Sequence, residues 1–170
     1  MSASIVLREA TPEDAAELLA LKLQLDTESQ FMMFEPGERN TTVEEMRAEI
    51  EADSSGDRGV AIVAVVDGRI VGYVGIERGA FRRIRHVGYI VAGVLREFGG
   101  QGIGTQLFVA AESWARAHGI LRLELTVMAH NTAGVRLYQR SGFTIEGTRT
   151  SAMLVDGKLV DEFYMAKLLT

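Results

Sequence analysis

Residues 99–105 read Gly99-Gly100-Gln101-Gly102-Ile103-Gly104-Thr105, with four glycines among seven residues. An apolar, strand-like segment that ends at Val94 precedes it, and a helical pattern over residues 102–118 follows. Glycine adopts positive φ and lets a ligand approach the backbone closely. A glycine-rich bend between a strand and a helix also presents several N–H groups at the positive end of the helix, which suits a diphosphate. The alternative is a bend that binds nothing.

This stretch has three possible interpretations as a phosphate-binding turn. A P-loop requires Gly-Lys-Ser/Thr, and the lysine is missing before Thr105. A dinucleotide-binding turn would use Gly100 and Gly102, with Glu124 as the acid that follows about 20 residues later. However, a dinucleotide domain opens with its turn, whereas this turn lies past the middle of the chain. Coenzyme A is the third ligand that fits such a bend.

The residues before the bend predict an antiparallel meander. Strand-like runs of apolar and β-branched residues cover residues 5–8, 60–66, 70–77 and 85–94, and Asp67-Gly68 is a hairpin signal. Two helices are expected in this half of the chain. Thr11 precedes the first as its N-cap, and Thr42 forms a capping box with Glu45 at the start of the second.

The residues after the bend alternate between helix and strand. A helix is expected over 102–118, a strand over 121–127, a helix over 131–141, and two closing strands from 143 onward and over 159–167. Ala133, Leu137 and Phe143 are expected in the core. The whole order predicts a mixed α/β fold in one domain over residues 1–170, with a mostly antiparallel sheet of about seven strands flanked by about four helices.

Composition excludes several classes of function. The chain has 18 Lys and Arg against 23 Asp and Glu, so it lacks the basic balance of a nucleic-acid-binding protein. It has no Cys, which excludes a thiolate metal site and a Cys nucleophile. The first residues lack the layout of a signal peptide, and no apolar run approaches the length of a membrane span. We therefore expect a cytoplasmic protein without a metal, a nucleic-acid partner or a membrane partner.

Residues 94–104 resemble the acetyl-CoA motif of the GNAT family of N-acetyltransferases, which reads Arg/Gln-x-x-Gly-x-Gly/Ala after a strand. A second family signature is matched by Asn131, Ala133, Leu137-Tyr138 and Gly142-Phe143. The last segment, residues 146–165, is similar to the subgroup that includes the phosphinothricin and L-amino acid N-acyltransferases. The two motifs stand in the order and at the separation that the family has.

The resemblance implies a GNAT-like fold in which the fourth and fifth strands splay apart and acetyl-CoA lies between them. The pantetheine arm would pair with the backbone of the fourth strand, and the diphosphate would lie on the bend. The implied cofactor-binding residues are Ala92, Gly93, Val94, Gly99, Gly100, Gln101, Gly102, Ile103, Gly104, Thr105 and Asn131. Asn131 is also a favoured helix N-cap, and the two roles are compatible. Gly99 departs from the family, which has Arg or Gln there, so one side-chain contact is lost.

Three residues are candidates for the proton transfers of an acetyl transfer. Tyr138 is implied as the general acid, because a phenol with a pKa of about 10 protonates a departing thiolate. An interior Tyr whose hydroxyl merely finds a partner is the alternative. Glu77 and His86, at the ends of adjacent strands, are candidates for the base. An exposed charge and a structural hydrogen-bonding side chain are the respective alternatives.

The cost of deprotonating the acceptor amine narrows the substrate class. At pH 7 a lysine-type amine of pKa about 10.4 costs about 4.6 kcal/mol to neutralise, and an α-amine near 7.8 costs about 1 kcal/mol. A site without a strong base therefore fits a small α-amine such as an amino acid or an analogue. Acetylation of a protein N-terminus or of Lys, and a non-catalytic acetyl-CoA sensor, are the alternatives.

The run Phe31-Met32-Met33-Phe34 has two interpretations. It packs as a loop against the core, or it forms an adaptable apolar wall over the substrate pocket, since Met repacks easily. Together with the terminal strands, the run also makes a homodimer an expectation.

Overall fold

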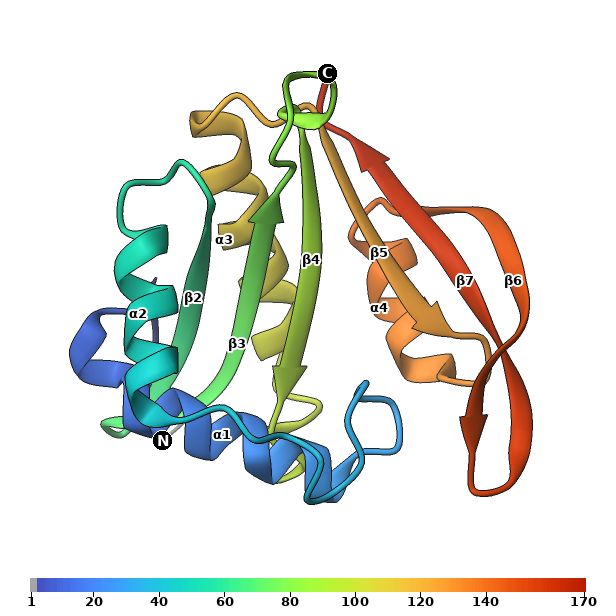
Figure 1. The fold of residues 1–170 in the computed structure, drawn as a ribbon, viewed down its shortest axis with the longest axis horizontal. Coiled ribbons are helices and arrows are strands. Elements are labelled where there is room, and N and C mark those ends of the chain that lie inside the picture. Colours follow the sequence, from blue (N-terminus) through green and yellow to red (C-terminus); the bar gives the residue numbers. More distant parts are fainter. Residues whose placement is uncertain (1–2) are drawn as a thin grey trace.

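The computed structural model describes residues 3–170. In this part of the chain seven strands form one mixed sheet, in the order β1-β2-β3-β4-β5-β7-β6, and four α-helices cover it (Figure 1). The strands are β1 (Ile5–Glu9), β2 (Gly59–Val66), β3 (Arg69–Arg78), β4 (Val87–Val94), β5 (Arg122–Met128), β6 (Thr144–Val155) and β7 (Lys158–Leu168). The helices are α1 (Ala15–Glu28), α2 (Val43–Asp53), α3 (Ile103–Ala117) and α4 (Thr132–Arg140), with short 3-10 turns η1 (Pro12–Asp14), η2 (Arg82–Ile84) and η3 (Arg96–Phe98).

These elements confirm the predicted mixed α/β fold, with its mostly antiparallel sheet and its flanking helices. The predicted bounds of the strands and helices differ from the observed ones by one or two residues, except at the first helix: the start predicted after Thr11 is the 3-10 turn η1, and α1 begins at Ala15. Among the described strands, β4 and β5 form the one parallel pair, and every other neighbouring pair is antiparallel. The meander therefore comes first in the chain and the parallel βαβ unit second, as expected.

The helices cover both faces of the sheet. In Figure 1, α1 and α2 lie in front of β2 and β3, and α3 and α4 lie behind the sheet. Strands β2 and β3 are buried on both faces, which explains why each reads as a nearly continuous apolar run. Val63, Val71 and Val74 in these strands have no exposed surface. The meander is thus a packed platform that fixes the position of β4.

Short polar contacts lie at the start of α2, where the sequence predicts it, and at the start of the 3-10 turn η1 that leads into α1. The Thr42 hydroxyl accepts from the Glu45 N–H at 3.1 Å, and the Glu45 carboxylate accepts from the Thr42 N–H at 3.1 Å. At the entrance to α1, the Asp14 carboxylate accepts from the Thr11 N–H at 2.7 Å and pairs with Arg8 at 2.6 Å. Side chains therefore satisfy the starts of η1 and α2, whereas in the described part of the chain no side chain caps α1, which continues from η1.

The sheet opens between β4 and β5. Their parallel pairing covers only three positions, from Val87 opposite Arg122 to Tyr89 opposite Glu124. Past that point β4 stays paired with β3 as far as Val94, and β5 stays paired with β7 as far as Met128. The two strands diverge, which confirms the predicted splay (Figure 1). Their facing edges carry backbone N–H and C=O groups that no neighbouring strand satisfies.

Substituting Asp14 tests the entrance to α1. Hydrogen bonds from Arg8 and from the Thr11 N–H lower the pKa of Asp14 from 3.8 to about 2. Because this pKa is lower in the folded state, the stabilisation is fully present above about pH 4 and is lost as the pH falls through about 2. We expect Asp14→Asn to lower the free energy of unfolding at pH 7 by about 1 kcal/mol.

Urea denaturation across pH measures this effect, with Glu13→Gln, the exposed neighbour, as the matched control. The Asp14→Asn and wild-type midpoints should converge near pH 2. Equal midpoints at pH 7, or a difference that persists unchanged at pH 2, would contradict the role of this carboxylate.

Candidate functional site

The segment between β4 and α3 is held in place from two sides. The backbone N–H of Arg96 donates to the Glu28 carboxylate at 2.6 Å, and the Arg96 guanidinium donates to the Glu28 carbonyl. Glu97 forms a salt bridge with Arg69 at 2.9 Å. The end of α1 and the start of β3 therefore fix η3, from which the glycine bend departs.

The glycine bend leaves the first amides of α3 open. Gly100 and Gly102 have φ values of 73° and 80°, which favour glycine because other side chains are strained there. Within residues 3–170 no side chain caps α3, and its first backbone hydrogen bond runs from the Gln106 N–H to the Gly102 carbonyl at 3.1 Å. The N–H groups of residues 103–105 thus form a cluster of donors at the positive end of the helix, with no acceptor among residues 3–170.

The other glycines of the bend have different roles. A Cβ at Gly104 would lie 3.0 Å from Leu137 Cδ2, so this glycine lets α3 approach α4 closely. Gly99 has an ordinary φ of -67°, and its nearest contact is the Arg96 carbonyl at 3.1 Å from an added Cβ. Its backbone conformation does not require glycine. Ile103 is 1% exposed and anchors the start of α3, whereas Gln101 and Thr105 are exposed.

The β4 side of the splay is formed by Ala92, Gly93 and Val94. Gly93 faces α1, where an added Cβ would lie 2.7 Å from Leu25 Cδ1. At the closed end of the splay, the Tyr89 and Thr126 hydroxyls are 2.8 Å apart and join β4 to β5 beyond their last paired residues. Sequence analysis missed this bridge, because it depends on the parallel register of two distant segments.

Tyr138 lies on α4, and its ring packs on the rings of Phe108 and Phe143, with centroids 5.3 and 6.4 Å away. Tyr138 is half-buried, and its hydroxyl has no hydrogen-bond partner among the described residues and is not sealed from the surface. Burial, and to a lesser degree the neighbouring Tyr89, raise the pKa of Tyr138 above 10. The phenol therefore stays protonated at neutral pH and has a proton to donate.

Asn131 caps α4, because its side-chain oxygen accepts from the Gly134 N–H at 3.0 Å. The predicted helix start is therefore confirmed, while a contact of Asn131 with the cofactor stays a prediction. Phe143 is 3% exposed and belongs to the core. Leu137 is partly buried and packs against the core. Ala133 was wrongly expected in the core: it lies in the first turn of α4 and is exposed.

A cavity of about 940 Å³ lies on the face of the sheet that α1 and α2 cover. β3 contributes Tyr73, Gly75 and Glu77 to its lining, and β4 contributes Tyr89 and Val91. Charged side chains also reach it from α1, α2, the end of β3 and the loops, namely Lys22, Arg39, Glu49, Asp53, Asp57, Arg58, Arg78 and Arg85. The cavity therefore adjoins the splayed strand β4 and carries charges of both signs.

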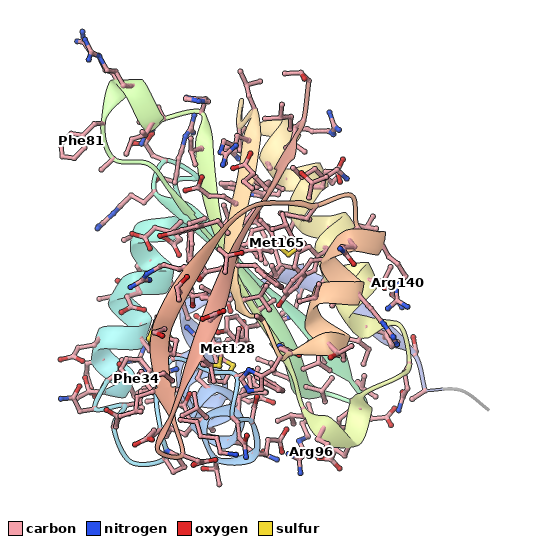
Figure 2. All side chains as sticks on the ribbon, turned by 90° about the vertical axis from the view of Figure 1, so that its right-hand side faces the viewer. Phe34, Phe81, Arg96, Met128, Arg140 and Met165 are labelled. Atoms are coloured by element: carbon pink, nitrogen blue, oxygen red, sulfur yellow. The ribbon has the colours of Figure 1, made fainter. Side chains whose placement is uncertain are left out.

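The loop between α1 and α2 forms the apolar wall of this cavity, with Met32, Met33 and Phe34 in its lining. Arg39 holds the loop, since it donates to the Asp26 carboxylate at 2.7 and 3.1 Å and lies 4.6 Å from the centre of the Phe34 ring. Figure 2 shows Phe34 in the same half of the molecule as Met128, the last residue of β5. Both interpretations of residues 31–34 hold in part, because Met32 also packs against the core and Phe31 packs on the ring of His130, outside the cavity lining.

The two candidates for the base lie in different surroundings. Glu77 lines the cavity, directly opposite Tyr89 in the β3–β4 register. His86 precedes β4 at its paired end, where its carbonyl accepts from the Leu121 and Arg122 N–H groups at 2.8 and 3.1 Å. The imidazole of His86 is exposed and does not line the cavity. The structure therefore brings Glu77, but not His86, to the site.

The dinucleotide interpretation of the bend is wrong. Its acid, Glu124, is engaged by Arg122 at 3.0 Å. The sheet also contains a single parallel pair within the described strands, whereas a dinucleotide-binding domain is built from several parallel strands. None of the helices in residues 3–170 is both long and apolar enough to cross a membrane.

Comparisons with known proteins agree with this geometry. The model of the acetyltransferase (GNAT) family matches residues 24–143, which is more than half of the chain. The L-amino acid N-acetyltransferase AaaT of Escherichia coli is 31% identical over 111 residues, covering 63% of this chain and 67% of that protein.

Solved structures share the whole fold. A GNAT acetyltransferase from Streptococcus pneumoniae has a TM-score of 0.94 and 34% sequence identity, over 98% of this chain and 100% of that one. A phosphinothricin acetyltransferase from Sinorhizobium meliloti, in complex with AcCoA, has a TM-score of 0.83 and 20% identity, over 99% of this chain and 89% of that one. The resemblance to this family and subgroup is confirmed. This chain belongs to the acetyltransferase (GNAT) family and is an acetyl-CoA-dependent acyltransferase.

Proposed function

We propose that this enzyme moves the acetyl group of acetyl-CoA to the primary amine of a small molecule, an amino acid or an analogue, by direct attack in a ternary complex. One observation carries the proposal: the splay between β4 and β5 begins beside a large charged cavity and ends near a helix start with open amides. The donor would then lie in the splay and the acceptor in the cavity, and the two sites would adjoin along β4.

The donor would lie in the splay. The backbone of Ala92, Gly93 and Val94 would pair with the pantetheine amides as an added strand would. The diphosphate would accept hydrogen bonds from the open amides of residues 100–105. A backbone N–H of β4 near the thioester would stabilise the negative charge that develops on its carbonyl oxygen.

The chemistry would need one proton removed and one supplied. The neutral amine attacks the thioester carbonyl, the new C–N bond forms, the C–S bond breaks, and the coenzyme A thiolate leaves. Tyr138 would give its proton to that thiolate, and its raised pKa supports this role, since the phenol is protonated beforehand. Glu77 would take the proton of the attacking amine, directly or through water, because it lines the acceptor cavity.

The choice of an amino acid as acceptor has two supports. An α-amine costs less to neutralise than a lysine amine, and a single carboxylate such as Glu77 is a weak base. The relative in Escherichia coli is named as an L-amino acid N-acetyltransferase. Acetylation of a protein N-terminus would use the same α-amine chemistry and is the second candidate. A sensor without catalysis is the third, and the free Tyr138 hydroxyl argues against it.

A homodimer and a cytoplasmic location stay predictions. Of the two features that suggested a dimer, the run 31–34 contributes Met32, Met33 and Phe34 to the lining of the cavity. The other remains, because the β6–β7 hairpin exposes Leu154, Leu159 and Leu168, each by about two thirds. We expect sedimentation velocity to give the mass of a dimer. A monomer at all concentrations would contradict this expectation.

Thiol release in the presence of acetyl-CoA and an amine panel tests the reaction itself. We expect turnover with amino acids and little turnover with N-terminal peptides or with lysine side chains. Preferential turnover with peptides would favour the protein N-terminal alternative. Binding of acetyl-CoA without turnover of any amine would favour the sensor.

Tyr138→Phe tests the general acid. Without a proton donor the thiolate is a poorer leaving group, so we expect kcat to fall by about 100-fold. The Kd for acetyl-CoA should stay within about twofold, because the ring still packs on Phe108 and Phe143. An unchanged kcat would remove Tyr138 from the mechanism.

Gly102→Val tests the bend. A branched side chain at φ 80° strains the turn and blocks the approach of a diphosphate, so acetyl-CoA should no longer raise the thermal midpoint of the protein. Gly157→Val is the matched control, since Gly157 has φ 77° and open space around it at the β6–β7 turn. The control should lose some stability but keep the shift on adding acetyl-CoA. Persistence of that shift in Gly102→Val would show that the bend does not bind the donor.

A further inference from the structure

Lys22 is a charged residue on the buried face of α1. It lies one helical turn from Leu18 and from Leu25, which are 1% and 2% exposed, so it shares their side of the helix. Its ammonium nitrogen lies 4.9 Å from the centre of the Tyr73 ring, and both residues line the cavity. The charge of half-buried Lys22 is therefore held over an aromatic ring at the wall of the cavity.

No counterion touches this ammonium. Among residues 3–170, no carboxylate oxygen lies within 4.0 Å of it. The nearby Arg39 is already paired with Asp26, whose side chain is 2% exposed, so these two charges cancel. Burial and the Arg39 charge lower the pKa of Lys22, while Glu49, Asp53 and Asp26 act on it from a longer range in the opposite direction. Lys22 thus lacks an anion at contact distance.

The floor of the cavity separates this positive charge from a negative one. Tyr73, Gly75 and Glu77 alternate onto the same face of β3, about 13 Å from the first to the last. Gly75, in the middle, has nothing closer than 3.9 Å to an added Cβ, so the floor is bare there. Tyr73 lies opposite Gly93 and Glu77 opposite Tyr89, so both charges flank the stretch of β4 that borders the splay.

We propose that Lys22 binds the carboxylate of the acceptor, which is therefore a zwitterionic α-amino acid whose amine lies over Gly75 on the side of Glu77. This inference rests on the proposed function and adds to it the group that selects the substrate. A carboxylate would supply the missing counterion of Lys22, and the same contact would orient the amine toward β4. An acceptor in which an amide replaces the carboxylate lacks that contact. This holds for amino acid amides and for the N-terminal residue of a peptide.

Lys22→Met tests the inference, because it keeps the length of the side chain and removes its charge. Acetylation of L-methionine and of L-methioninamide is measured with wild type and variant, and each acceptor is compared only with itself, since their amine pKa values differ. For the variant we expect kcat/KM to fall about tenfold or more with L-methionine, mainly through KM. It should stay within about twofold with the amide. Lys158→Met, on the exposed β6–β7 hairpin, is the matched control and should leave kcat/KM unchanged for both acceptors.

The outcomes separate this inference from the proposed function. Suppose that wild type acetylates amino acids but that Lys22→Met lowers kcat/KM equally for both acceptors, or for neither. The role given to Lys22 is then wrong and the proposed function stands. If acetylation of the amide is too slow to measure with either protein, the kinetic constants for L-methionine decide. A higher KM in the variant supports the inference, and a lower kcat with an unchanged KM overturns it. If wild type acetylates neither acceptor while acetyl-CoA still raises its thermal midpoint, the proposed function and the inference fall together.

Discussion

The divergence of β4 and β5 is the constraint on which the site depends. β3 holds β4 along its whole length and β7 holds β5 along its whole length, so the two strands share only three paired positions. The edges that face each other beyond Tyr89 keep unsatisfied backbone groups, which a ligand with amides of its own satisfies well. The hydroxyls of Tyr89 and Thr126 join the strands where the backbone pairing stops and so define the closed end of the splay.

The helix starts differ in whether a side chain caps them, and this difference distinguishes α3, beside the splay, from α2 and α4. α2 is capped by Thr42 and Glu45, and α4 is capped by Asn131. In the described part of the chain, α3 has no such side chain and begins instead after Gly102 in a left-handed conformation. An uncapped helix start costs stability unless something else accepts its hydrogen bonds. The amides that remain open are those beside the splay, where an anionic donor would arrive.

Local patterns predicted most of the fold and part of the site. The capping box at Thr42, the glycine bend and the alternation of strands each depend on residues close in sequence, so their physical signal is local. The cavity does not have a local signal, because α1, α2, β3 and β4 each contribute a few residues to it. Lys22 is a charge within the apolar stripe of a helix, but it was not singled out from the sequence. His86 misled because it adjoins β4, although β4 runs eight residues, about 26 Å, away from it toward the bend.

Amide hydrogen exchange with and without acetyl-CoA tests most directly that the splay and the bend hold the donor. We expect slower exchange in peptides that cover residues 90–95 and 100–106 when acetyl-CoA is added, and no change in β1 or α2. Unchanged exchange in both of those segments at saturating acetyl-CoA, or protection confined to another part of the molecule, would contradict it.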